Sequence, residues 1–426
     1  MTTKKNLVKL VLMSITTAAT MIFTACSNDD SPVVPTTNAN VGKAASAPAS
    51  GTKTVLIYMA GRNNLSDDLM TDLREVKEGS KRLSQNHQLI VFVRNQYDPQ
   101  PWVARIRNGE VTDSVSLSDL GIRSSDGHNR ASDPEVLEGV MRYAFTHYPA
   151  TNGNYGLVIE GHGSGWLMSK ETERSNSRAV AADYGNFNYS GDARWINIPT
   201  MASILKGLPH LKFIMTDCCN MMCLENLYEL RHACDYMIGS AAEIPDCGAP
   251  YDQIVPDMFA DGQFYTGIID KYYNAVKGFL PLVAVKTSEM DNVAQATRTA
   301  LQAVKEKNGD GYPDMKGIIH YYHLSESDKF LPEYNIFYDA GDYLHTFAPA
   351  DVYQQWHQVL KRAVVERRIA TRWGTDKPWS MKYADFTVTE EKMHGVSMFV
   401  PQDPSLGDNA QYNEDIKRMS WWNAIN

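Results

Sequence analysis

One histidine and one cysteine of this chain stand where covalent catalysis would need them. His162 lies between two glycines after the apolar run 157–159, and Cys219 follows the apolar run 211–216. Such runs, ending in polar and reactive residues, are typical of strands that deliver catalytic groups to the carboxyl edge of a parallel sheet. A thiolate attacks and an imidazole transfers protons, so the pair indicates a thiol peptidase. The order of His before Cys excludes the papain arrangement.

The neighbours of the pair suggest how the chemistry would be assisted. We expect Cys219 at the start of a helix over residues 220–233, where the positive end of the helix dipole would lower the thiol pKa. His162 would act as general acid and base. The glycines allow the backbone to approach a substrate closely, and the amides of Gly163 and Cys219 are candidates for an oxyanion hole.

Two carboxylates, Asp217 and Glu160, lie near Cys219 and His162 in the sequence, and their presence beside a catalytic pair has to be explained. Asp217 and Cys219 are two residues apart, so in an extended strand end both side chains project to one side. A carboxylate there would raise the thiol pKa, and one explanation is that Asp217 caps the following helix. Glu160 is the carboxylate nearest to His162 in the sequence, but no third catalytic residue is indicated and we expect a Cys-His dyad.

The two runs resemble the clostripain family of cysteine peptidases, which shares the caspase-like fold with gingipains, legumains and caspases. The family has one strand ending in His-Gly-x-Gly-Trp and another ending in Asp-Ala-Cys-x-Met. Cys218 replaces the alanine, and Cys219 takes the nucleophile's place on register. The matching residues are His162, Gly163, Ser164, Gly165 and Trp166, then Asp217, Cys218, Cys219, Asn220 and Met221.

Three further stretches are similar to bacterial lipoprotein members of that family, so the resemblance runs from about residue 52 to the C-terminus. They cover residues 54–65, 238–252 and 395–401. Arg62 is a departure, because an aspartate is expected there.

The resemblance implies a specificity. It makes Asp217 the acid that receives a P1 Arg or Lys as a charge-assisted pair, and Asp246 a weaker second contact. A buried carboxylate left unpaired rejects neutral side chains, so the substrates would be proteins or peptides with a basic P1 residue. The resemblance also implies self-processing, for which Lys170, Arg174 and Arg178 are the candidate sites.

Calcium dependence occurs in the resembled family, but the sequence shows no convincing ligand set and no cofactor is expected with certainty. Residues 308–314 are similar to a calcium loop without the EF-hand spacing, so a tight turn is favoured. After Cys26, five cysteines remain, and we interpret Cys218, Cys223 and Cys234 as buried small apolar residues rather than zinc ligands.

Composition limits the partners. The chain has 426 residues, 43% of them hydrophobic, and 41 basic against 50 acidic residues give a net charge of -9. This acidic balance argues against a nucleic-acid partner. We expect a monomer.

The chain begins like an exported lipoprotein. Residues 1–25 carry lysines before an apolar run too short to span a membrane, which indicates a signal peptide. Cys26 ends a sequence that resembles a lipobox and would be lipidated, and residues 26–51 form a flexible tether. This predicts a protein of the bacterial cell envelope, lipid-anchored at the outer membrane or cell surface.

Strands alternate with helices along most of the remaining chain, which predicts an α/β fold with a mostly parallel sheet covered on both faces. We expect a caspase-like three-layer α/β/α peptidase domain over residues 52–290. Residues 291–426 would form a mainly helical region, with a helix over 352–371 and a strand returning at 396–400. The alternative function is a catalytically silent surface lipoprotein that uses the fold to bind protein or glycan.

Overall fold

The computed structural model describes residues 51–168, 179–185, 193–321, 336–371, 373 and 388–426. All of these belong to one compact unit. None of the helices in these ranges combines the length and the apolar character needed to cross a bilayer. The predicted signal peptide, Cys26 and the three candidate processing sites, Lys170, Arg174 and Arg178, lie outside the described residues.

A nine-stranded sheet forms the centre of this unit. Its strands are β1 (Thr54–Ala60), β2 (Gln88–Arg94), β3 (Trp102–Arg107), β4 (Glu110–Ser116), β5 (Tyr155–Gly161), β8 (Leu211–Asp217), β9 (Cys234–Gly239), β10 (Leu282–Lys286) and β12 (Val364–Arg368). Their order is β12-β10-β9-β8-β5-β1-β2-β3-β4. The five strands from β9 to β2 are mutually parallel, and on each side of them two further strands each pair antiparallel with the strand before.

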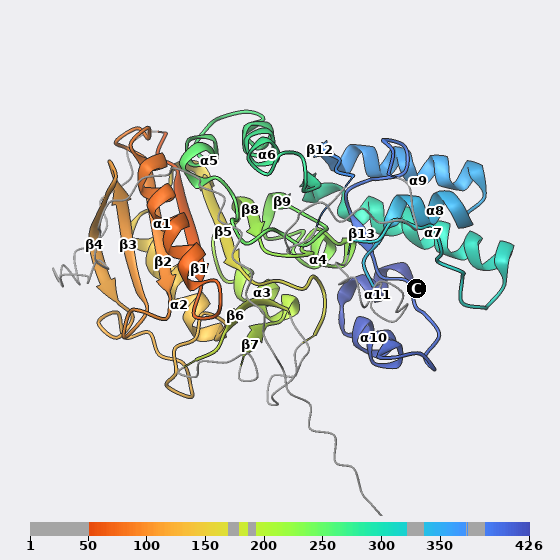
Figure 1. Cartoon of the computed structure of the whole chain (residues 1–426), viewed down its shortest axis with the longest axis horizontal. Helices are drawn as coiled ribbons and strands as arrows, with labels where there is room; N and C mark the ends of the chain where they lie inside the picture. The colour runs from red at the N-terminus through yellow and green to blue at the C-terminus, as the bar shows by residue number, and fades with distance from the viewer. Residues whose placement is uncertain (1–50, 169–178, 186–192, 322–335, 372, 374–387) are drawn as a thin grey trace, which may run out of the picture. The chain divides into compact units, whose positions relative to one another are not determined.

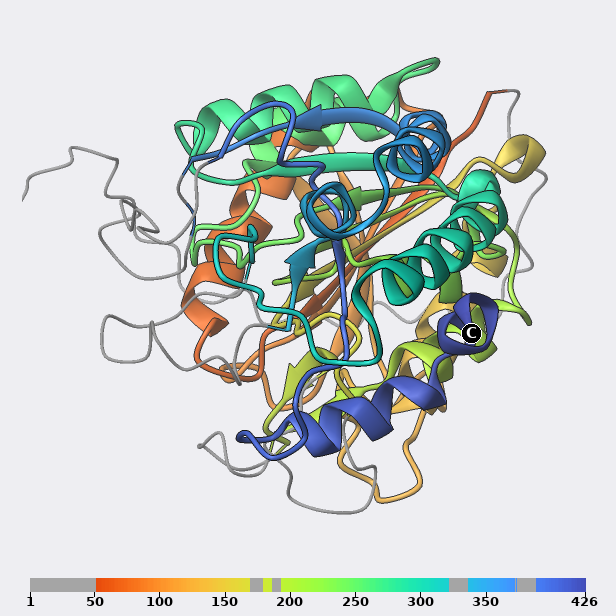
Figure 2. The same ribbon diagram turned by 90° about the vertical axis from the view of Figure 1, so that its right-hand side faces the viewer.

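Helices cover both faces of the sheet, as a three-layer fold requires (Figures 1 and 2). One face carries α1 (Ser66–Ser80), α5 (Tyr251–Met258) and α6 (Phe264–Ala275), which pack against one another in series. On the other face lie α2 (Pro134–His147), α3 (Ile198–Leu205), α4 (Leu224–Glu229) and α7 (Met290–Asn308). In Figure 2 the orange helix α1 lies to the left of the strands and the teal helix α7 to their right. The predicted three-layer α/β/α class is confirmed.

The remaining elements are short or belong to the C-terminal part. They are β6 (Val180–Asp183), β7 (Arg194–Ile196), β11 (Tyr338–Asp339), β13 (Ser397–Met398), α8 (Ala340–Phe347), α9 (Ala350–Ala363), α10 (Asn409–Asp415), α11 (Ser420–Ile425) and the 3-10 turns Thr151–Gly153, Thr287–Glu289 and Ile416–Arg418. The expected returning strand is β13, which pairs with β11 in a small second sheet. The predicted turn after residue 308 begins at Gly309, whose φ of 85° ends α7.

Two predicted helices are wrong in extent. The helix expected over 352–371 stops at Ala363, and the chain continues as β12, antiparallel to β10. The helix expected directly after Cys219 begins only at Leu224. Residues 219–220 form a turn in which Asn220 has a φ of 61°, and the amides of Asn220 and Met222 donate to the carbonyls of Ala242 and Ser240, so this segment is not helical.

Candidate active site

The sheet brings the two predicted catalytic residues to one edge. β5 and β8 are neighbouring parallel strands, in register at Glu160 and Asp217. Because parallel strands end at the same edge, the residues that follow them, His162 and Cys219, emerge side by side. Both line one cavity of about 360 Å³.

His162 is oriented by a residue that follows β1. Its Nε2 lies 2.8 Å from Oδ1 of Asn64, and the same oxygen accepts a hydrogen bond from the Tyr184 hydroxyl at 3.0 Å. Since an amide oxygen only accepts, the imidazole donates its Nε2 proton and, when neutral, keeps Nδ1 as an acceptor. The Trp195 ring lies 6.1 Å from the imidazole and also lines the cavity.

The glycine after His162 permits a close approach of two backbones. A methyl group at Gly163 would lie 2.7 Å from the Cys218 Cβ and 3.2 Å from the Cys219 amide nitrogen, so a side chain does not fit there. The segment is bonded to β6 through the His162 carbonyl and the Ser164 amide, which leaves the Gly163 amide out of that pairing. The two predicted oxyanion-hole amides therefore belong to adjoining backbone segments.

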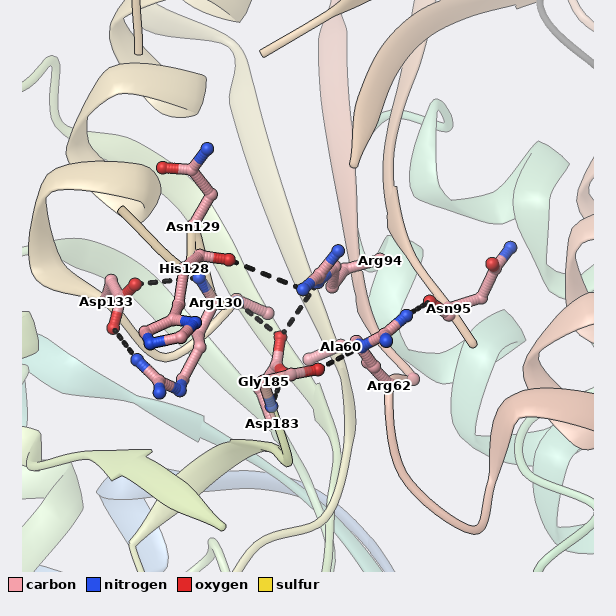
Figure 3. Close-up of polar contacts among 12 residues, drawn as sticks. Ala60, Arg62, Arg94, Asn95, His128, Asn129, Arg130, Asp133, Asp183 and Gly185 are labelled. Carbon is pink, nitrogen blue, oxygen red and sulfur yellow. Dashed lines mark hydrogen bonds and ion pairs between the residues drawn. The ribbon is translucent and has the colours of Figure 1, made fainter. Parts of the chain in front are cut away.

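A buried ion pair fixes the other side of β6 (Figure 3). The Asp183 carboxylate accepts from Arg94 Nε at 3.3 Å and from the amides of Ala131 and Gly185 at 2.8 and 2.6 Å. Arg62, the departure from the family pattern, donates to the Gly185 carbonyl and to that of Asn95. These contacts tie the strand that supports His162 to the ends of β1 and β2.

Cys219 and Cys218 have opposite environments. Cys219 is partly exposed and lines the cavity, and its Sγ accepts a hydrogen bond from the Ile244 amide at 3.3 Å. Cys218 is fully buried, and its thiol donates to the Ile159 carbonyl. Burial raises the pKa of the Cys218 thiol well above its ordinary value. The expected assistance from a helix dipole is wrong for Cys219, because α4 starts five residues later.

Asp217 lies at the floor of the cavity and accepts hydrogen bonds from three donors. The Tyr272 hydroxyl donates to Oδ1 at 2.6 Å, and the Ala249 amide and the Tyr251 hydroxyl donate to Oδ2 at 2.9 and 3.0 Å. Burial raises the pKa of Asp217, while these hydrogen bonds oppose the rise. The helix-cap alternative is wrong, because none of these partners belongs to α4.

A sequence model of the clostripain family matches residues 57–424. The chain belongs to the clostripain family of cysteine peptidases. Clostripain of Hathewaya histolytica is 26% identical over 236 residues, which are 49% of this chain and 42% of that protein. The chain thus spans about two fifths of the length of this curated relative.

Two solved structures agree with the family assignment. A secreted C11 cysteine protease from Bacteroides thetaiotaomicron, in complex with an irreversible peptide inhibitor, has a TM-score of 0.69 and 25% identity over 88% of this chain and 99% of that one. An inactive zymogen C11 protease from Parabacteroides distasonis has a TM-score of 0.69 and 26% identity over 90% of this chain and 99% of that one.

The cavity of this clostripain-family chain is strongly acidic. Besides Asp217, its lining carboxylates are Asp68, Asp72, Glu160, Glu243 and Asp246, and no Lys or Arg is among the described lining residues. Asp246, the expected weaker substrate contact, is exposed and lines the cavity. Within the described ranges, no three His, Cys, Asp or Glu side chains are grouped so that they could hold a metal ion.

Several residues of the cavity were given no role in the site by the sequence. Asp72 belongs to the buried face of α1, between Leu69 and Val76 at helical spacing, and an acid on such a face is a detectable signal. Glu160 interrupts an otherwise apolar strand, which is the same kind of signal. Asn64 and Trp195 come from a loop and from a three-residue strand, and no sequence period marks them.

Proposed function

We propose that the chain is an extracytoplasmic cysteine endopeptidase that cleaves after Arg or Lys. The observation that carries this proposal is the acidic cavity directly beside the Cys219 thiol, whose floor holds the buried carboxylate of Asp217. A P1 cation entering this cavity would gain a charge-assisted pair, whereas a neutral side chain would leave the carboxylates uncompensated.

The mechanism follows from the roles of a Cys-His dyad. The Cys219 thiolate attacks the scissile carbonyl, and the amides of Gly163 and Cys219 stabilise the oxyanion. His162 protonates the leaving amine, and an acyl-thioester with Cys219 forms. His162 then takes a proton from a water molecule that hydrolyses the thioester, while Asn64 keeps the imidazole in one orientation.

Location and activation are further parts of the proposal. The B. thetaiotaomicron neighbour is described as secreted, which supports action outside the cytoplasm. The P. distasonis neighbour is described as an inactive zymogen, which supports activation from an inactive precursor, and an internal cut is our proposal for how that happens. Lipid attachment at Cys26 stays a prediction.

A fluorogenic P1 scan of wild type and Asp217→Asn tests the specificity. We expect wild type to prefer Arg and Lys over norleucine at P1. Asp217→Asn should lose on the order of 3 kcal/mol, or about a hundredfold in kcat/KM, on basic substrates only. The exposed Asp119→Asn is the matched control and should behave as wild type. Equal losses on all three substrates would show that Asp217 supports the fold rather than P1.

The alternative of a catalytically silent binding protein is tested separately. A thiol-directed peptide inhibitor with Arg at P1 should label wild type and fail to label Cys219→Ala. No labelling of wild type, together with no hydrolysis of any P1 substrate, would favour the silent protein.

A further inference from the structure

A second pair of carboxyl groups lies beside Asp217 at the floor of the cavity. Glu160 on β5 is the register partner of Asp217 on β8, so the two side chains leave the same face of the sheet. Asp72 reaches the same place from α1. A Cβ atom added at Gly248 would lie 3.2 Å from Oδ2 of Asp72 and 3.1 Å from Oδ2 of Asp217. Carboxyl groups from three separate elements therefore line the floor of the same cavity.

The side chains of Asp72 and Glu160 interact directly, although both are acids. Each is only 5% exposed. Glu160 Oε2 is buried, and no N–H or O–H group of the described residues donates to it. Two buried carboxyl groups in such proximity disfavour joint ionisation, which favours one proton held between them.

The surroundings keep that proton in place. Burial raises the pKa of Asp72 to about 8, and burial followed by the charge of Asp72 raises the pKa of Glu160 well above its ordinary value. The other acids facing the pair are Asp68 and Glu75 of α1 and Asp217 of β8. Tyr251 of α5 and Tyr272 of α6 face the same acids, as does Cys247 on the loop after β9.

Asp72 and Glu160 differ from Asp217 in their hydrogen-bond donors. Asp217 already has three neutral donors, whereas the described lining residues bring no Lys or Arg to Asp72 and Glu160. A cationic group that enters the cavity supplies a positive charge beside the pair and so favours the ionised form of both acids.

We infer that Asp72 and Glu160 form the distal end of the P1 pocket, bind the charged end of a P1 Lys or Arg, and release their shared proton to solvent when it arrives. This inference rests on the proposed function and adds two specificity-determining residues to it. The proton balance is simple: a protonated pair and a cation become a doubly ionised pair with the cation bound, plus one proton in solution.

Kinetics with matched variants provide the first test. Glu160→Gln and Asp72→Asn preserve size, and Glu78→Gln on the exposed face of α1 is the control. At pH 8 both pocket variants should lose roughly tenfold or more in kcat/KM on Lys and Arg substrates and keep the norleucine rate. The control should match wild type throughout. Equal losses on basic and norleucine substrates would overturn the inference, and absence of cleavage by wild type would instead refute the proposed function.

Direct binding gives a second test that does not need catalysis. Cys219→Ala would be titrated by calorimetry with acetyl-Ala-Ala-Lys-amide and its norleucine counterpart, in phosphate and in Tris at pH 7. We expect the lysine peptide to release up to one proton, seen as a buffer-dependent heat, and the norleucine peptide to release none. Adding Glu160→Gln should abolish the release. Lysine binding without any proton release would refute the shared-proton role even if the enzyme cleaves after lysine.

Discussion

At the scale of single residues, the two adjacent thiols make the sharpest contrast. Cys218 is buried against the Ile159 carbonyl, and burial raises the pKa of its thiol, whereas Cys219 lines the cavity. We predict that Cys219→Ala abolishes hydrolysis of a P1 Arg substrate while Cys218→Ala retains most of it. Steady-state rates of the two purified variants check this. An inactive Cys218→Ala and an active Cys219→Ala would place the nucleophile one residue earlier.

The sequence predicted the site residues that stand in short motifs and missed those that the fold delivers from elsewhere. His162, Cys219 and Asp217 follow strands that the apolar runs made visible, and the register of β5 and β8 brings them together. Asp72 and Asn64 reach the same cavity from the first helix and the loop before it. Local periodicity cannot tell which distant side chain will meet a strand end, because that depends on strand order.

At the scale of elements, β6 bears on the candidate processing site at Arg178. Ala179, which would follow a cut at Arg178, is buried, and its carbonyl accepts from the Ser164 amide at 2.7 Å. The next residues, Val180 to Ala182, are also buried, and Ala181 binds the His162 carbonyl. A peptidase cleft binds several residues on each side of the cut in extended form, so a cut at Arg178 would require β6 to detach.

We therefore predict that any self-processing occurs after Lys170 or Arg174 and not after Arg178. Wild type and Cys219→Ala would be incubated side by side and their new N-termini mapped. Fragments beginning at residue 171 or 175 should appear in wild type alone. A fragment beginning at residue 179 would contradict the protection by β6, and an uncut but fully active wild type would remove the need for processing.

In the elements whose ends were wrongly predicted, pairing with distant segments determines the secondary structure more strongly than the local sequence does. Residues 364–368 continue the helical spacing of α9, yet they pair with β10 and become a strand. In residues 220–222 the local signal against a helix is Asn220, a residue type that tolerates the positive φ of a turn. In both places the partner strand or loop is distant in sequence, so propensity alone favoured the helix.

At the scale of the whole molecule, the end of the chain is part of the same compact unit as the site. The Ser397 amide binds the Met222 carbonyl, and the Phe399 amide binds the buried Glu225 carboxylate at 2.7 Å. Ser420 binds Glu229 through both its amide and its hydroxyl. The segment that follows Cys219 and leads into α4 is thus held by residues far beyond position 290.

The buried acids of the cavity should make the stability of the whole protein depend on pH in an unusual direction. Burial raises the pKa of Asp72 to about 8 and raises that of Glu160 as well, whereas both titrate near pH 4 in an unfolded chain. Between these values the folded state binds more protons than the unfolded state, so stability falls as pH rises. His357 affects stability at lower pH. Burial lowers its pKa to about 4, so its contribution to the stability of the folded state is lost as pH falls below about 6.5.

Between pH 6.5 and 8.5 the change of stability with pH therefore comes mainly from carboxyl groups whose pKa is raised. Glu225 is one such group outside the cavity, because burial raises its pKa to about 7. We predict that Cys219→Ala, used to prevent self-digestion, loses on the order of a few kcal/mol of unfolding free energy across this window. Glu160→Gln in the same background removes the shared proton and should flatten the slope, so that it becomes the more stable protein at pH 8.5. Urea unfolding at several pH values measures both slopes. Parallel slopes would mean that Glu160 binds no extra proton in the folded protein over this pH range, which would contradict the shared proton.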